Sequence, residues 1–431
     1  MITVLVVVFL VLLVAGVPIA YCMGLGSWLA MTIHMPNATS AIISKMFGGL
    51  DSFSLMAVPF FILAGNLMDS SGISRQLVDF ANLIVGKIKG GLSMTSVVAG
   101  VIFAGVSGSA SADTSALAAI LIPAMTREGY EKSWSSCLIA TVGMLGPIIP
   151  PSILAILYSA ATGVSVGAIF IAGVIPGLIL AITLIVLCRM YAKKNPVIWE
   201  NQKKNQKHYT GKEIGQLLVS VIPALLMPFI IIFGILSGVF TATESAAVAC
   251  VYAMLYGFIS KRLPFKTLWK CLVDSAVAIS KLMLIVCLAT LFGWILSVQN
   301  FPIKVRDAMM AFTDNKYVIL FLILLLLLFI GCFMETIAAL TILVPVLAPI
   351  ATALSINPIH FAEFMIIALL VGAITPPVGI NLYITTSVAG IPFSKSLKHL
   401  APFLIMAIVT TLLVMFIPQL TTLLPGLLHL S

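Results

Sequence analysis

The stretch GPIIPPS, residues 146–152, interrupts an apolar segment that is long enough to cross a lipid bilayer. Proline lacks a backbone N–H and glycine frees the backbone, so this stretch predicts a helix that opens at membrane depth. A second stretch, GAITPPVG at residues 372–379, has its glycine and proline pair at the same spacing. Unwound backbone cannot face lipid, so both breaks should lie against protein or line a wet cavity. Such a matched pair is typical of transporters with duplicated halves.

The composition excludes a soluble domain. Of 431 residues, 61% are hydrophobic and 9% are charged, and the mean hydropathy is +1.19, which indicates a polytopic membrane protein. The net charge of +9 comes mostly from basic residues in short links between apolar stretches, a pattern that sets orientation in the bilayer. The seven cysteines have no CxxC spacing and the five histidines are isolated, so neither a transition-metal site nor an enzyme active centre is predicted. No Walker motif is present, so ATP hydrolysis by this chain is unsupported.

Basic links divide the apolar sequence into two halves. We expect an all-α membrane protein with a first repeat over residues 1–191, a basic cytoplasmic linker over 192–213 and a second repeat over 214–431. Each half offers about five crossings. Because five is odd, a duplicated second half would insert upside down relative to the first, as an inverted-topology repeat.

Each half also contains a long apolar stretch with a polar centre. Residues 92–125 have basic residues at both ends, which favours a re-entrant helical hairpin that enters and leaves on one side. The matching hairpin is expected over residues 301–350, and the broken helices over 134–162 and 361–389. We expect the two hairpin tips to meet the two breaks near the middle of the bilayer.

Asp113 and Glu335 occupy matching places in the two tips, each ten residues before a proline. A carboxylate in apolar sequence is costly unless it is paired, hydrated or functional. Two interpretations stay open: each carboxylate caps the N-terminus of a half-helix, or it binds ion or substrate directly. Half-helix N-termini suit an anion, and unwound carbonyls suit a hard cation. The further candidates for substrate contacts are polar residues at the same places, namely Ser109, Ser111, Thr114 and Asn381.

Six sequence motifs together resemble a known family. In chain order they are VPFFILAGNLM with the SGSASAD tip, GPIIPPS, GVFTATESAAVA, METIAALTILVPVLAPI and ITPPVGINLYI, and they are spread over nearly the whole chain. This series resembles the large membrane (M) subunit of tripartite ATP-independent periplasmic (TRAP) transporters of the bacterial inner membrane. The resemblance implies sodium-driven import of an organic acid anion, such as a dicarboxylate, sialic acid or a sugar acid. It also implies two partners, a small four-helix membrane subunit and a periplasmic substrate-binding protein, and an elevator-type movement of the core that bears the hairpins.

The resemblance further implies two sodium sites, each where a hairpin tip meets a broken helix. Carried onto matching positions, the first site would use Ser107, Gly146, Ile149 and Pro151. The second would use Gly331, Gly372, Thr375 and Val378. Most of these ligands would be backbone carbonyls, and no cofactor other than the coupling sodium ions is implied. Glu335 departs from the family pattern, in which aspartate is more frequent.

Two other functional classes remain open. A stand-alone sodium-coupled carboxylate transporter of similar architecture would need no binding protein. A channel would need a continuous polar path, whereas the polar residues here gather at two tips. The sequence does not specify which organic acid is carried.

Overall fold

The computed structural model is helical, with no β-strand among the residues that it describes. The described residues are 1–38, 40–205, 210–313 and 315–430. Positions 206–209 of the expected linker lie outside them. The expected boundary at residue 191 falls inside a helix that continues to Lys194.

The order of helix types is similar in the two halves. The first half contains α1 (Ile2–Val14), α2 (Ile19–His34), the 3-10 turn η1 (Pro36–Ala38), α3 (Ser40–Leu50), α4 (Ala57–Ser70), α5 (Ile73–Val85), α6 (Gly91–Ser107), α7 (Ala110–Arg127), α8 (Lys132–Val142), α9 (Leu145–Ile148), α10 (Ile153–Thr162), α11 (Val166–Ala172), α12 (Val174–Lys194) and α13 (Pro196–Asn205). The second half contains α14 (Gly211–Leu236), α15 (Ala242–Ile259), α16 (Phe265–Val298), α17 (Phe301–Phe312), α18 (Lys316–Gly331), α19 (Thr336–Ala353), α20 (Pro358–Gly372), α21 (Ile380–Ala389), α22 (Phe393–Phe416) and α23 (Gln419–Leu427). In each half a helix pair with a polar tip is followed by a broken helix.

The described helices fit a multi-pass membrane protein. Six of them are long and apolar enough to cross a membrane, and the number is seven when the broken pair Lys132–Ile148 and Ile153–Thr162, bent by 41°, counts as one span. Five shorter apolar helices among the described residues have 10–17 residues: α6 and α18 are arms of the hairpins, α20 precedes the second break, and α1 and α4 lie outside both. A count of five crossings in each half, with the second half inverted, stays a prediction.

Local sequence explains the first hairpin. Helix α6 ends at Gly108, whose φ of 64° is left-handed and therefore favours glycine. Ser109 follows in an extended conformation, and its Oγ accepts a hydrogen bond from the backbone N–H of Ala112 (3.5 Å), which caps α7. The chain therefore reverses within two residues and brings α7 back along α6.

The second hairpin is shorter than expected. The range 301–350 includes a separate helix, α17, because Thr313 is extended (φ −164°, ψ 143°) and Asn315 caps a new helix through the N–H of Tyr317 (2.9 Å). The hairpin itself consists of α18 and α19. Glu335 caps α19, since its carboxylate accepts from the N–H of Ala338 (3.1 Å).

Both helix breaks occur where the glycine and proline pairs lie. After α9 the chain is extended at Ile149, and Ser152 then caps α10 by accepting from the N–H of Ala155 (3.1 Å). The second break begins after α20, and α21 starts behind Gly379, which has a left-handed φ of 51°. Both proline–proline peptide bonds, in residues 150–151 and 376–377, are cis.

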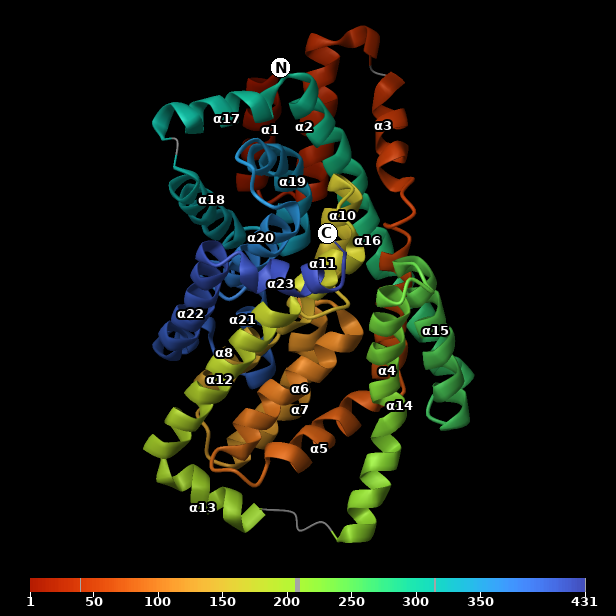
Figure 1. Ribbon diagram of the computed structural model, residues 1–431, viewed down its shortest axis with the longest axis vertical. Coiled ribbons are helices and arrows are strands. Elements are labelled where there is room, and N and C mark those ends of the chain that lie inside the picture. Colours follow the sequence, from red (N-terminus) through yellow and green to blue (C-terminus); the bar gives the residue numbers. More distant parts are fainter. Residues whose placement is uncertain (39, 206–209, 314, 431) are drawn as a thin grey trace.

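The hairpins and the broken helices pack across the two halves. Helix α7 lies against α8 and also against α21, whereas α19 lies against α20 and also against α10. Figure 1 shows these elements in the middle of an elongated molecule, with α3, α4, α14, α15 and α16 along one side. The 34-residue α16 connects the two regions, since it packs on α2, α3 and α4 and also on α19.

Candidate functional site

The first hairpin tip contacts the first helix break directly. The backbone N–H of Ile153 donates to the carbonyl oxygen of Gly108 across 3.3 Å. A Cβ on Gly108 would lie 2.5 Å from the carbonyl oxygen of Pro151, and a Cβ on Gly146 would collide with the carboxylate of Asp113. Glycine therefore allows the close approach of backbone at Gly108 and of the Asp113 carboxylate at Gly146.

The second tip meets the second break even more closely. The N–H of Val378 donates to the carbonyl oxygen of Cys332 across 3.2 Å. A Cβ on Gly372 would collide with the backbone of Gly331. The tip and the break therefore touch through a glycine in each segment. The hydroxyl of Thr375, just beyond the end of α20, donates to the carbonyl oxygen of Val371 in that helix (2.6 Å). All four residues that the resemblance assigns to the second sodium site thus lie in or beside one contact.

The carboxylate of Asp113 is buried, with 2% of the residue exposed. Its Oδ1 accepts a hydrogen bond from the hydroxyl of Ser107, and the N–H of Ser109 donates to that hydroxyl oxygen (3.2 Å). Its Oδ2 has no hydrogen-bond partner among the described residues. An ionised carboxylate is costly to bury without a counter-charge, so this geometry suits a cation between the first tip and Gly146.

Glu335 has a different role from Asp113. It is the N-cap of α19, so the capping interpretation is confirmed for Glu335. The cap of α7 is Ser109 instead, which leaves Asp113 one turn inside the helix with an oxygen that no capping bond occupies. The two matching carboxylates of the sequence therefore meet different surroundings.

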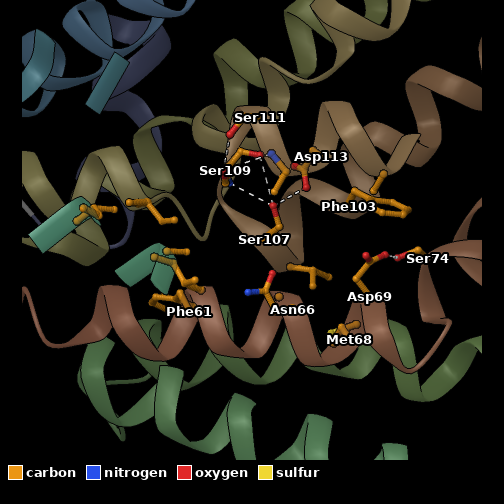
Figure 2. A pocket seen from close by; sticks show the side chains of 18 of the residues that line it. Phe61, Asn66, Met68, Asp69, Ser74, Phe103, Ser107, Ser109, Ser111 and Asp113 are labelled. Carbon is orange, nitrogen blue, oxygen red and sulfur yellow. Dashed lines mark hydrogen bonds between the residues drawn. The ribbon is translucent and has the colours of Figure 1, made fainter. Parts of the chain in front are cut away.

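A cavity of about 530 Å³ lies between the tips and the helices at the side of the molecule. Four predicted substrate contacts line it from the tips, namely Ser109, Ser111, Asp113 and Glu335, together with Ser107 of the first predicted sodium site. Helix α4 contributes Asn66 and Asp69 from the opposite side, as Figure 2 shows. Helix α16 contributes Lys281. The cavity is large enough for a small organic molecule.

A second, smaller cavity of about 60 Å³ is lined by both tips and both breaks. Asn381 lines this small cavity, but its side chain is 1% exposed and its amide donates to the carbonyl oxygen of Ala140 (3.2 Å). Thr114 lines neither cavity, because it is buried against Gly143. Of the six predicted substrate contacts, four face the large cavity and these two do not.

Four polar residues of the large cavity, Asn66, Asp69, Ser74 and Lys281, were missed by sequence reasoning. Lys281 lies within the apolar helix α16, and an isolated lysine in such a segment is itself a signal of function. Asn66 and Asp69 lie on α4, within and just after the motif VPFFILAGNLM. The amide of Asn66 donates to Ser275 of α16 (2.9 Å), and Asp69 accepts from Ser74 (2.5 Å). These residues lie on helices α4, α5 and α16 and not at a tip or a break, so the paired motifs do not indicate them.

Comparison with known proteins fits this arrangement of tips, breaks and cavity. A sequence model described as "Tripartite ATP-independent periplasmic transporter, DctM component" matches residues 6–420. The chain belongs to this family. It is 36% identical over 417 residues to the sialic acid TRAP transporter large permease protein SiaM of Vibrio cholerae, with 96% of each chain covered. It is 36% identical over 412 residues to the C4-dicarboxylate TRAP transporter large permease protein DctM of Pseudomonas aeruginosa, with 95% of each chain covered.

Solved structures show the same fold at low sequence identity. The YdaH transporter of Alcanivorax borkumensis has a TM-score of 0.61 and 16% identity, with 88% of each chain covered. Family membership makes this chain a TRAP large permease, which is a multi-pass inner-membrane transport protein and not an enzyme. The DctM family belongs to tripartite systems, as its description states.

Proposed function

We propose that this TRAP permease imports an organic acid anion by sodium symport, and that a periplasmic binding protein delivers the anion while a small membrane subunit supports the permease. Sodium ions bind at the two contacts between tip and break. The anion binds in the large cavity beside them. The core that bears the hairpins then moves against the side helices in an elevator-type step.

One observation carries this proposal: the buried Asp113 has an oxygen without a partner, and it faces Gly146 of the first break. A carboxylate and unwound carbonyls are the oxygen ligands that hard cations prefer. The serine hydroxyl of Ser107 holds Oδ1 and leaves Oδ2 for the ion. Sodium bound there would cancel a buried charge, which gives the ion a direct thermodynamic gain.

The charges of the cavity explain why the anion follows the cation. The ionisable side chains among the described lining residues are Asp69, Asp113, Glu335 and Lys281, so acids outnumber bases. An anionic substrate is repelled by this surface until cations neutralise part of it. After sodium binds, the positive charges of Lys281 and of the N-terminus of α7 attract the carboxylate of the substrate. Coupling therefore needs no separate gate.

The substrate class rests on the relatives and on the driving force. The two relatives above carry the names of sialic acid and C4-dicarboxylate transporters, and a 2,3-diketo-L-gulonate TRAP permease of Escherichia coli is 35% identical over 407 residues. Each named compound is an organic acid. One charge that moves through 100 mV contributes about 2.3 kcal/mol, so two or more sodium ions per anion support strong accumulation.

Uptake into proteoliposomes tests the proposal. The permease is reconstituted with its small subunit and supplied with its binding protein, which is first matched to an acid by ligand-induced melting shifts. An inward sodium gradient should drive accumulation, and replacement of sodium by potassium should abolish it. The Asp113→Asn variant should lose most sodium-driven uptake. Lys281→Met should keep sodium binding but raise the substrate concentration for half-maximal uptake.

Other outcomes separate the alternatives. Uptake that persists in potassium removes the sodium coupling. Robust sodium-driven uptake without any binding protein selects the stand-alone carboxylate transporter. Passive flux without partners or a gradient selects the channel.

A further inference from the structure

Glu363 is a buried carboxylate that the sodium and substrate sites do not use. It lies in the middle of α20, and 1% of the residue is exposed. Its Oε2 has no hydrogen-bond partner, and the ion pairs of the described residues do not include it. A polar group buried in this way normally has a ligand or a function.

The position of Glu363 connects the second half of the chain with the first helix break. A Cβ placed on Gly173, between α11 and α12, would lie 3.3 Å from Oε1 of Glu363 and would collide with the carbonyl oxygen of Ile148. Ile148 is the last residue of α9, a single turn. The final carbonyls of a helix have no partner within the helix, so this oxygen is an available acceptor beside the carboxyl group.

The surroundings of Glu363 favour its neutral form when no cation is near. Helices α9 and α11 carry no ionisable side chain. The hydroxyl of Thr421 donates to the carbonyl oxygen of Pro418 and lies 3.0 Å from Nδ1 of His360, while Nε2 of that histidine has no hydrogen-bond partner among the described residues. The other ionisable side chains on the helices around α20 and at their ends are Tyr158, Cys188, Arg189, Tyr191, Lys193, Lys194, Lys316, Tyr317, Cys332, Glu335, Lys395, Lys398 and His399.

None of these groups pairs with Glu363 in the described structure. The basic residues of α12 begin at Arg189, which is about 24 Å along the helix from Gly173 at 1.5 Å per residue. Without a counter-charge, an ionised carboxylate at this depth would cost several kcal/mol, on the order of the penalty for any buried unpaired ion. A proton on Glu363 removes that cost and supplies a donor for the carbonyl of Ile148.

We propose that Glu363 is a proton-binding site of the transport core, and that it releases its proton when sodium binds at the first break. This inference rests on the proposed sodium symport. Sodium at the first break lies close to the segment that follows Ile148 and supplies the positive charge that Glu363 otherwise lacks. The O–H bond of the carboxylic acid then breaks, the proton passes to water, and the carboxylate remains beside the cation. Acid pH should therefore weaken sodium binding.

Infrared difference spectroscopy of the reconstituted protein tests this directly. When sodium replaces potassium in the buffer, the carbonyl band of a protonated carboxylic acid should decrease and the carboxylate bands should increase. The change should vanish in Glu363→Gln. Glu128→Gln is the matched control, since Glu128 also has a buried Oε2 without a partner but lies beyond the end of α7, so its spectrum should resemble wild type.

A second measurement follows the linkage between proton and sodium. In wild type the apparent sodium dissociation constant should rise as pH falls, with a limiting slope of about tenfold per pH unit for one released proton. In Glu363→Gln the slope should fall by the contribution of one proton, and any slope that remains belongs to the carboxylate of Asp113 at the sodium site. His360→Gln should still release a proton when sodium binds. If proton release is lost in His360→Gln but kept in Glu363→Gln, Glu363 is not the proton-binding residue.

The wild-type spectrum keeps the proposal testable even when a variant does not fold. Sodium-specific binding without any change in the carboxylic acid band overturns the role of Glu363 and leaves the symport intact. If sodium causes no larger spectral or thermal response than potassium does, the proposed sodium symport itself is contradicted.

Discussion

The two hairpin tips match in sequence but differ in how they use their acidic residue. In the first tip Ser109 caps the helix, and one oxygen of Asp113 has no hydrogen-bond partner in the part of the chain that the structure describes. In the second tip Glu335 is itself the cap, and its carboxylate is held by the N–H of Ala338. Both carboxylates precede a helix proline by ten residues, yet α7 begins four residues earlier relative to its proline than α19 does.

The difference shows that the position of each carboxylate relative to the start of its helix decides its role: it either caps the helix or can bind an ion. A carboxylate at the N-cap gives up its lone pairs to backbone N–H groups, whereas one that lies a turn further into the helix can hold an ion. The longer glutamate side chain reaches back to cap its own helix. We therefore expect the first tip to supply most of the charge for sodium and the second tip to act mainly through close backbone contact.

Substitution of the glycines at the two contacts should have the largest effect. Gly372→Ala drives a Cβ into the backbone of Gly331, which cannot move aside, so the unfolding free energy should fall by about 1–3 kcal/mol and uptake should be lost. Gly146→Ala meets the end of the Asp113 side chain, which can rotate, so its stability loss should be smaller while sodium affinity drops. Thermal unfolding in detergent, with and without sodium, distinguishes the two.

Gly215→Ala is the matched control for both glycine variants, because none of the described residues has an atom within 4 Å of the added Cβ. It should leave melting and uptake close to wild type. Equal destabilisation by Gly372→Ala and Gly146→Ala would show that the two contacts are equally rigid, and the comparison between the tips would be wrong.

Neutralisation of Asp113 should have the next largest effect. Asp113→Asn removes the charge that has no counter-ion, so apparent sodium affinity should fall by about tenfold or more, a loss of about 1.4 kcal/mol. Stability without sodium should be unchanged or higher, since a buried unpaired charge is gone. Sodium titrations of thermal stability measure both. A variant that melts earlier in potassium yet binds sodium as tightly as wild type would assign Asp113 a structural role.

The sequence predicted the large features of this fold because they depend on strong local signals. The prolines and glycines at 146–152 and 372–379 exclude continuous helix, and a polar centre in the apolar stretch 92–125 excludes a simple crossing. The start of the second hairpin was placed too early, at residue 301, because no glycine or proline separates α17 from α18 in the sequence. Helix α17 ends at one extended residue, Thr313, which the sequence pattern does not indicate.

The site was less predictable than the fold because its members come from distant helices. Nothing local to Asn381 indicates that its amide turns to Ala140 rather than to a cavity. Lys281 and Glu363 each lie in a single apolar helix without a motif, and their surroundings exist only after the halves pack. The capping role of Glu335 was one of two open interpretations, since sequence spacing alone does not fix which residue starts a helix.

Removal of the second carboxylate should have a moderate effect. Glu335→Ala deletes the cap of α19 and should lower the unfolding free energy by about 0.5–2 kcal/mol. Its effect on sodium affinity should stay within a few fold, far below that of Asp113→Asn. Glu335→Asp should restore stability, because aspartate is a good N-cap residue. A loss of sodium binding in Glu335→Ala that matches Asp113→Asn would place both carboxylates in the ion sites.

The smallest stability effect is expected for the cap of the first tip. The bond from the N–H of Ala112 to Ser109 is long, at 3.5 Å, whereas Ser152 accepts from Ala155 at 3.1 Å and also donates to Pro147 at 2.5 Å. Ser109→Ala should therefore cost about 0.5 kcal/mol, the low end for a cap, and Ser152→Ala more. Because Ser109 faces the large cavity, its loss should instead raise the substrate concentration for half-maximal uptake. Equal melting shifts in the two variants, with unchanged uptake in Ser109→Ala, would show that Ser109 only caps α7 and does not contact the substrate.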